Sequence, residues 1–156
     1  MRQIEQLVHH AEWRKAGYAA VLAGDFNCGP AVPDGGNALP ALVLKSGTTV
    51  AACDRVSAGN YRRLGELGWQ DTHTALGLPE QATWHPTANR LNAGGEHTSW
   101  GCPPQRIDGV FIQASELQAT AGGVFLTEHM VRVPGAEKVP LSDHHGYWVT
   151  LDKARA

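Results

Sequence analysis

The chain has little net charge, no long apolar run and no targeting pattern, and each shortage excludes a class of protein. Its 156 residues carry 13 Lys and Arg against 15 Asp and Glu. A net charge of −2 with a pI near 6.4 gives no overall basic field, so tight nonspecific binding of nucleic acid is not expected. No apolar stretch reaches the roughly 18 residues of a membrane-spanning helix, and the start of the chain shows no secretory signal.

Cysteine is also scarce. The chain has three, Cys28, Cys53 and Cys102, which are far apart in the sequence and show no C-x-x-C spacing. An odd number of scattered cysteines argues against a disulfide scaffold and against a cysteine metal site, and it favours a reducing compartment. We therefore expect a cytoplasmic location.

The rest of the composition, with 42% apolar and 18% charged residues, is that of one globular domain, and the hydrophobic pattern predicts an α/β (α+β) fold. Helices are expected over residues 2–17 and 54–67, the second with Asp54 as its N-cap and Gly68 at its end. Strands are expected over residues 18–26, 106–113, 117–126 and 146–151, the third broken at Gly122 and Gly123. Residues 41–52 are either a short hairpin or irregular, residues 131–139 are a strand or a loop, and residues 28–40 and 73–105 are surface loops.

Asp25 and Asn27 follow a short apolar run and precede a turn at residues 28–30. Residues two apart on an ideal strand point to the same face, so we expect the carboxylate and the amide to lie side by side. Such a pair suits a phosphate oxygen, a water molecule or a hard cation. The alternative interpretation is a turn capped by an Asx side chain.

Chemistry-bearing residues stand at three expected strand ends. They are Asp25 with Asn27, Asp108, and Asp143 with His144. Together they offer carboxylates for a hard divalent cation and an imidazole that a carboxylate can hold in one tautomer. A group of this kind fits metal-assisted attack of water on a phosphate ester, because it can stabilise charge that builds on the phosphoryl oxygens.

Three motifs stand in order along the chain: Gly24-Asp25-Phe26-Asn27, then Thr83-Trp84 with Arg106-Ile107-Asp108-x-x-Phe111, and finally Leu141-Ser142-Asp143-His144-His145. This order resembles the endonuclease/exonuclease/phosphatase superfamily, whose members include pancreatic-type deoxyribonuclease, abasic-site endonuclease, inositol polyphosphate 5-phosphatase and neutral sphingomyelinase. The middle motif looks most like the sphingomyelinase-type and related bacterial phosphodiesterase branches. The resemblance implies a metal-dependent hydrolase of phosphate esters, acting on nucleic acid, inositol phosphate or phospholipid.

Carried over by position, the resemblance also implies roles for individual residues. Asp25 would orient or deprotonate the attacking water, and Asn27 would hold a phosphoryl oxygen. Asp143 would be a ligand of Mg²⁺, or of Mn²⁺ or Ca²⁺, directly or through water. His144 would contact the scissile phosphate, and Asp108 would bond to His144 and fix its ring.

Other residues in and near the motifs receive supporting roles. Thr83 and Trp84 would buttress the site and contact the substrate, and Ser142 would hold the last turn. We expect Arg106 to make a structural ion pair and His145 to be structural. No site role is expected for His73, His85, His97 or His129.

The resemblance implies a four-layer sandwich of two similar halves, each a mainly antiparallel or mixed sheet with flanking helices. Residues 1–156 match only the second half, so we expect a partial domain that lacks the first half and its metal-binding Glu. Glu5 and Glu12 lie on the expected first helix and not at a strand end. A half domain exposes an apolar sheet face. The alternatives are therefore an inactive fragment that needs a partner half or self-associates through this face, and a plain α/β binding module.

Overall fold

The computed structural model describes residues 19–30, 42–43, 49–50, 53–85, 104–113, 116–125, 130–131, 134 and 139–154. The helix expected over residues 2–17 lies outside this part of the chain, as do residues 31–40 and 86–103 of the two expected loops. Within the described residues, the fold is a mixture of helices and antiparallel strand pairs, which confirms the α+β class. No helix in this part of the chain has the length and apolar character that crossing a membrane requires.

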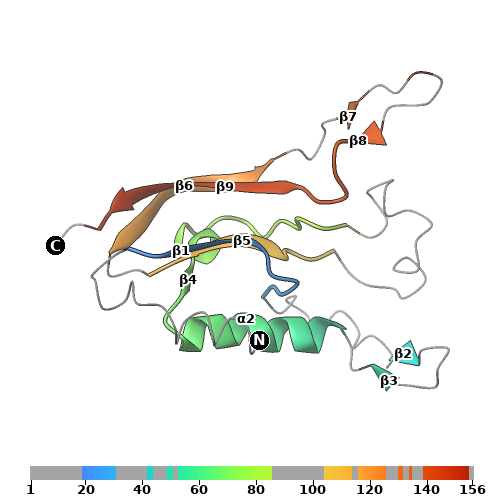
Figure 1. Cartoon of the computed structure of the whole chain (residues 1–156), viewed down its shortest axis with the longest axis horizontal. Coiled ribbons are helices and arrows are strands. Elements are labelled where there is room, and N and C mark those ends of the chain that lie inside the picture. The colour runs from blue at the N-terminus through green and yellow to red at the C-terminus, as the bar shows by residue number, and fades with distance from the viewer. Residues whose placement is uncertain are drawn as a thin grey trace.

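Two strand groups form the body of the fold (Figure 1). The first has the order β1 (Val21–Asp25), β5 (Asp108–Ile112) and β4 (Gln70–Asp71), and the second pairs β6 (Leu117–Phe125) with β9 (Gly146–Lys153). Two short hairpins pair β2 (Leu42–Val43) with β3 (Thr49–Val50), and β7 (Met130–Val131) with β8 (Val139–Pro140). Within the segments 41–52 and 131–139, the described residues include one short antiparallel pair in the first and, at the two ends of the second, residues of the β7–β8 pair.

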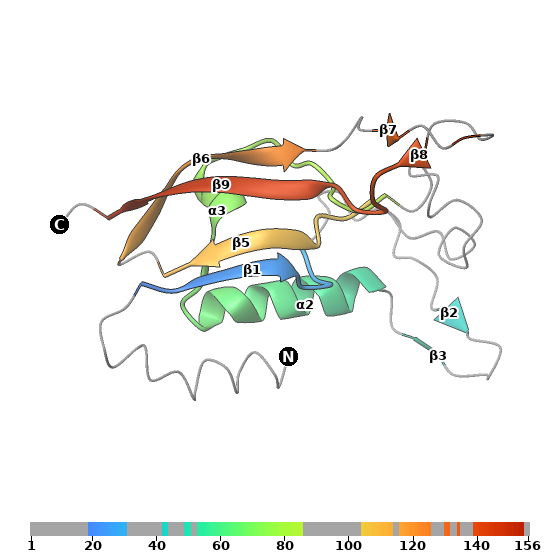
Figure 2. The ribbon, with the colours of Figure 1, turned by 45° about the horizontal axis from the view of Figure 1, so that its top comes forward.

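The two strand groups meet through Trp84. This residue forms an isolated bridge to Gln105 on one side and to His144 on the other. It thereby joins the segment that leads into β5 to the segment that leads into β9. Figure 2 shows the resulting succession β6, β9, β5 and β1, with α2 beyond β1.

Helix α2 (Cys53–Glu66) covers one face of β1 and β5. Its Leu64 is completely buried in a cluster with Ala20, Cys28, Trp69 and Phe111. The helix ends where expected, because Gly68 adopts a φ of 86° that side-chain-bearing residues rarely tolerate. The prediction that Asp54 is the N-cap was wrong. The helix begins at Cys53, so Asp54 lies inside it.

The first part of the expected surface loop over residues 73–105 instead contains a short helix and buried residues. The short helix α3 (Thr72–Ala75) follows β4 directly, and its N-cap Asp71 accepts the backbone N–H of His73 at 3.0 Å. Thr72, His73 and Thr83 are buried. A polar, aperiodic sequence predicted exposure here, but hydrogen bonds between Thr72 and Val110 and between Thr83 and residues 107 and 108 satisfy the two hydroxyl groups and allow their burial.

Strand β6 also differs from the expectation, because it continues through Gly122 and Gly123. The irregularity lies earlier, where the register with β9 shifts between Ala119 and Ala121. Gly122 is needed for close packing, since a Cβ there would lie 3.0 Å from the side chain of Leu76 and from the carbonyl of Trp148. The glycines therefore serve contact with α3 and β9 and do not end the strand.

Three large apolar side chains of the strands are exposed, although Val110 and Ile112, which share a side with Val21, are buried. Leu22 packs on the cluster beside α2, so Val21 points to the opposite face, and it is 46% exposed. Tyr147 contacts Thr72 and His73 of α3, so Trp148 points away from α3 and is 46% exposed. Phe125 on the neighbouring strand is 43% exposed. Val21, Phe125 and Trp148 define what we call the open face.

Candidate functional site

The antiparallel pairing of β1 with β5 brings two of the predicted site residues together. Asp25 is the last residue of β1, Asp108 is the first residue of β5, and the two are register partners. His144 lies in the turn before β9, and its Nδ1 is 2.8 Å from Oδ2 of Asp108. Each of the three side chains offers a ligand atom within 4.8 Å of the others. Three segments that are far apart in the sequence therefore converge at one edge of the fold.

The Asp108–His144 pair defines which ring nitrogen faces the site. A carboxylate can only accept a hydrogen bond, so Nδ1 of His144 carries the hydrogen and donates it to Asp108. The side chains of His144 and Asp108 are 23% and 19% exposed, so the pair is partly shielded from water but reachable. The Nε2 atom is then the nitrogen that can meet a ligand, and the ring is held by its carboxylate partner.

Asn27 does not lie beside Asp25 on the strand as expected. The strand ends at Asp25, and Asn27 has a φ of 47°, a left-handed conformation that Asn tolerates better than most residues. Its backbone N–H donates to Oδ1 of Asp25 at 2.8 Å. The turn with an Asx cap, which was the alternative interpretation, is therefore correct. Asn27 is exposed next to Asp25, and its role toward a phosphoryl oxygen stays a prediction.

The turn before β9 places Ser142, Asp143 and His144 in different environments. The backbone N–H of His144 donates to Oγ of Ser142 at 3.1 Å, so Ser142 holds the turn as predicted. Asp143 is exposed and does not belong to the group formed by Asp25, Asp108 and His144. Its assignment as a metal ligand therefore stays a prediction from the resemblance alone.

Thr83 and Trp84 contact the chain segments that carry Asp108 and His144. Thr83 has 0% exposure, so in this structure its side chain cannot contact a substrate, and that part of the prediction needs correction. Its Oγ1 instead accepts the backbone N–H groups of Ile107 and Asp108, each at 3.1 Å. Trp84 is half-buried between Gln105 and His144. Both residues lie where a buttress was expected.

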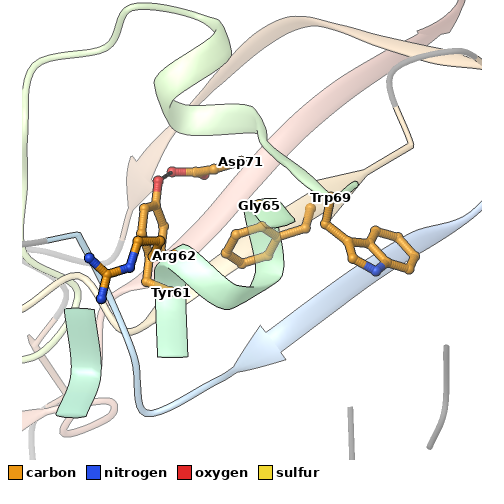
Figure 3. A pocket seen from close by; sticks show the side chains of 6 residues that line it. Tyr61, Arg62, Gly65, Trp69 and Asp71 are labelled. Carbon is orange, nitrogen blue, oxygen red and sulfur yellow. Dashed lines mark hydrogen bonds between the residues drawn. The ribbon is translucent and has the colours of Figure 1, made fainter. Parts of the chain in front are cut away.

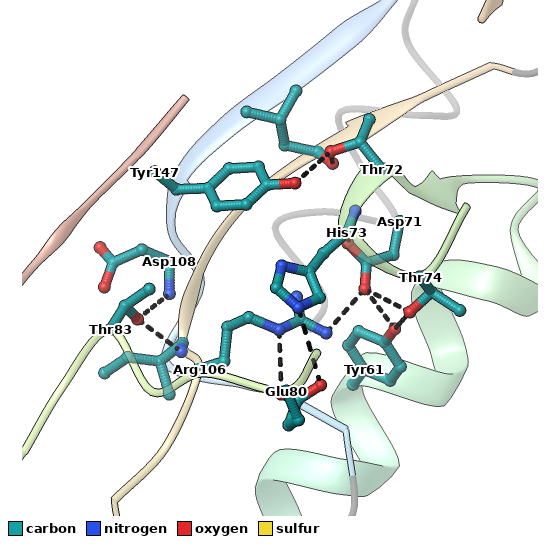
Figure 4. A network of polar contacts seen from close by, with 12 residues as sticks. Tyr61, Asp71, Thr72, His73, Thr74, Glu80, Thr83, Arg106, Asp108 and Tyr147 are labelled. Carbon is teal, nitrogen blue, oxygen red and sulfur yellow. Dashed lines mark hydrogen bonds and ion pairs between the residues drawn. The ribbon is translucent and has the colours of Figure 1, made fainter. Parts of the chain in front are cut away.

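Arg106 makes the predicted ion pair, at the centre of a buried network (Figure 4). Its Nη2 lies 2.9 Å from Oδ2 of Asp71, with the two side chains only 2% and 5% exposed, and its Nε lies 3.0 Å from Glu80. Asp71 also accepts hydrogen bonds from Tyr61 and Thr74. No sequence pattern predicts these partners, because 35 positions separate Asp71 from Arg106.

The charges in this network shift each other's pKa values. Burial alone would raise the pKa of Asp71, but the hydrogen bond from Tyr61 and the charge of Arg106 outweigh burial and hold the pKa below its ordinary 3.8. Burial alone would lower the pKa of Arg106, but Asp71 and Glu80 raise it. Both groups therefore stay charged, and they fix the chain two residues before Asp108.

The other described histidines lie outside the group of Asp25, Asp108 and His144. His73 is 2% exposed, and burial together with the charge of Arg106 lowers its pKa, so it stays neutral in the interior. Burial also lowers the pKa of His85. The backbone N–H of His145 donates to the carbonyl of Thr83 at 2.6 Å. His97 and His129 lie outside the described residues.

Cys28 lies close to the site in sequence but has no nucleophilic character. Burial, with a contribution from the charge of Asp25, raises the pKa of its thiol to about 11. The reactive form of cysteine is the thiolate, so a buried thiol with this pKa is inert near neutral pH. Cys28 therefore belongs to the core and not to the site.

A cavity of roughly 330 Å³ lies on the other side of β5 (Figure 3). It is lined by Tyr61, Arg62, Gly65, Trp69, Asp71 and Phe111. Phe111 and Asp108 are an odd number of residues apart on β5, so their side chains point to opposite faces. The cavity is thus separated by the sheet from the group of Asp25, Asp108 and His144.

Comparison of the chain with protein-family models, with curated proteins and with solved structures found no match in any of the three. The assignment of function therefore depends on the site itself.

The first prediction concerns the Asp71–Arg106 pair. Arg106→Met leaves a buried carboxylate without its cation, and we expect it to lower the free energy of unfolding in urea by about 3–5 kcal/mol. Because the pKa of Asp71 is lower in the folded than in the unfolded chain, the stabilisation is present above about pH 4 and is lost as the pH falls through the lowered value. The difference between wild type and variant should therefore shrink in acid.

Glu80→Gln is the matched control for this prediction. Glu80 contacts the same guanidinium, but its side chain is 48% exposed, so its loss should cost less than about 1 kcal/mol. An equal decrease in the free energy of unfolding in the two variants would show that burial does not set the strength of these ion pairs.

The second prediction concerns cation binding by the site group. We expect Asp25→Asn and Asp108→Asn each to weaken binding of Mn²⁺, measured by electron paramagnetic resonance, by at least about tenfold, because each removes one of two carboxylates. Asp152→Asn, an exposed acid on β9, should leave binding unchanged. Asp143→Asn should have a smaller effect than Asp25→Asn, since Asp143 lies outside the group. Mn²⁺ binding that survives in both site variants would contradict the assignment.

Proposed function

We propose that the chain is a metal-dependent hydrolase of phosphate esters, related to the endonuclease/exonuclease/phosphatase superfamily. One observation carries the proposal: Asp25, Asp108 and His144 come from three distant segments, yet their ligand atoms lie within 4.8 Å of one another. The Asp108–His144 hydrogen bond adds the carboxylate–imidazole pair that this chemistry uses. We further propose that the fold is one half of the four-layer sandwich of that superfamily.

The donor atoms fit a hard divalent cation. Two carboxylates and an exposed edge suit Mg²⁺ or Mn²⁺, which is held by a few carboxylates and retains several waters. Asp25 and Asp108 would hold it, since Nδ1 of His144 is used in the bond to Asp108. When bound, such a cation offsets the charge of the phosphate and stabilises the leaving oxygen.

The remaining catalytic roles belong to residues of the chain itself. Asp25, at the exposed edge, orients the attacking water or accepts its proton. His144 presents Nε2 to a phosphoryl oxygen, where a held hydrogen stabilises the charge of the transition state. Asp108 accepts the hydrogen of Nδ1 and fixes the orientation of the His144 ring. Asn27 offers its amide to a second phosphoryl oxygen from the adjacent turn.

The third prediction is a Mg²⁺- or Mn²⁺-dependent hydrolysis of bis(p-nitrophenyl) phosphate. We expect Asp25→Asn and His144→Gln to lower kcat/KM by at least about 100-fold, the usual contribution of a general acid or base. Asp152→Asn serves as the control, with an exposed acid removed from β9 and activity retained. If Asp25→Asn or His144→Gln hydrolysed the diester at the wild-type rate, the proposed function would be wrong.

The proposal leaves three classes of phosphate ester to compare as substrates: phospholipids, inositol phosphates and nucleic acids. The net charge of −2 disfavours duplex DNA as a substrate, because neutralising phosphates requires clustered Lys and Arg. Release of product from sphingomyelin, an inositol polyphosphate, abasic DNA and plasmid DNA, measured side by side, distinguishes the phospholipid, inositol phosphate and nucleic acid classes.

A second candidate is supported by the open face. Three large apolar side chains, Val21, Phe125 and Trp148, are each more than two-fifths exposed on strand faces that turn away from the helices. A monomer rarely exposes such a surface without a function for it. We propose that the face binds a partner half or a second copy, and that the isolated chain is inactive without one.

The fourth prediction tests this candidate by analytical ultracentrifugation. Wild type should associate, and Trp148→Glu should be monomeric, because a charge on the open face opposes burial of apolar surface. Leu141→Glu is the control, since Leu141 is 55% exposed but lies in the turn before β9. A monomeric wild type that hydrolyses the diester would exclude the second candidate.

A further inference from the structure

We propose that Thr83 is the positioning residue of the site, and that its hydroxyl and its backbone carbonyl together fix Asp108 relative to His144. The inference goes beyond the proposed function and depends on it for its catalytic consequence. It replaces the expected contact of Thr83 with substrate by an action through the two site residues.

The hydroxyl of Thr83 fixes the Asp108 side of the pair. Its Oγ1 accepts the N–H groups of both Ile107 and Asp108 at 3.1 Å, as the dashed lines in Figure 4 show. A hydroxyl oxygen has two lone pairs, so these two bonds use its full capacity as an acceptor. Both of these N–H groups at the start of β5, from which the Asp108 carboxylate projects, therefore share one acceptor atom.

The backbone of Thr83 fixes the His144 side. Its carbonyl accepts the N–H of His145 at 2.6 Å, and the next residue, Trp84, bridges to His144. Its own N–H donates to the carbonyl of Gln105 at 3.0 Å. Thr83 is thus bonded to the segment before Asp108 and to the segment that carries His144.

Because Thr83 is completely buried, we expect removal of its hydroxyl to disturb this arrangement. Thr83 is 0% exposed, so water cannot replace Oγ1 if it is removed. Two buried N–H groups would then lack an acceptor, and the backbone at Ile107 and Asp108 would shift to find one. A shift of about 1 Å in a catalytic group can lower a rate about 100-fold.

The chain offers a matched control in Thr72. Thr72 is also 0% exposed, and its Oγ1 donates to the carbonyl of Val110 at 2.8 Å, on the same strand two residues after Asp108. Thr72→Val and Thr83→Val each remove a hydroxyl from a completely buried position that contacts the backbone at or next to β5. They differ in that only the hydroxyl of Thr83 contacts the backbone of a site residue.

The first arm of the test measures amide hydrogen exchange, which needs neither metal nor substrate. In Thr83→Val we expect the amides of Ile107 and Asp108 to exchange at least about tenfold faster, while those of Val110 and Phe111 keep their wild-type rates. Thr83→Ser, which retains Oγ1, should restore protection. Unchanged exchange at Ile107 and Asp108 in Thr83→Val would overturn the positioning role.

The second arm measures Mn²⁺ affinity and hydrolysis of bis(p-nitrophenyl) phosphate. Thr83→Val should weaken Mn²⁺ binding at least about threefold and lower kcat about 10–100-fold with little change in KM, as expected when a group that acts in the transition state is misplaced. Thr83→Ser and Thr72→Val should retain both properties. Equal losses in Thr72→Val and Thr83→Val would reduce Thr83 to a purely structural role and overturn the proposal.

The two arms separate failure of this inference from failure of the proposed function. A wild type that neither binds Mn²⁺ nor hydrolyses the diester would reject the hydrolase, and hydrogen exchange would then decide alone whether Thr83 positions Asp108. An active wild type whose Thr83→Val variant keeps full kcat would reject the role of Thr83 and leave the hydrolase intact.

Discussion

The register between β1 and β5 is the constraint on which the site depends. It sets Asp25 opposite Asp108 and Leu22 opposite Phe111, and the second pair packs against α2. Because successive side chains point to opposite faces, a slip of one residue would turn Leu22 toward the open face and Asp25 toward the core. Burial of Leu22 and Phe111 therefore specifies where the two carboxylates meet, although neither residue belongs to the site.

This register has an electrostatic cost. Like charges on directly opposed residues of an antiparallel pair repel, so a pair of aspartates is unfavourable for the sheet taken alone. The chain reduces the repulsion by leaving Asp25 exposed and by giving Asp108 the imidazole of His144 at 2.8 Å. A bound cation would remove the rest. An arrangement that costs stability unless a positive group joins it is typical of functional sites, where a local rule is broken for chemistry.

The sequence could predict the parts of this site that local patterns determine. Asp25, Asp108 and His144 were each placed at a strand end by the apolar run beside them, and the antiparallel pairing confirms that such ends share one edge. The features of the site that the sequence could not predict depend on contacts between distant segments. The burial of Thr83 follows from N–H groups 24 and 25 residues away, and the ion pair of Arg106 with Asp71 spans 35 residues. Asn27 was misplaced because alternation was assumed to continue beyond the true end of β1.

Val21 of the open face and Asp25 of the site share one side of β1. Counting by twos from Asp25 along β1 leads through Ala23 to Val21, so these side chains project from the same side of the strand. His144 precedes Gly146, the first residue of β9, so the alternation that orients Trp148 does not orient His144. A partner that covers Val21 would approach the side of the sheet from which Asp25 and Asp108 project. If it reached the strand ends it would exclude water there and strengthen the charge interactions of the site, so binding at the open face would change the chemistry.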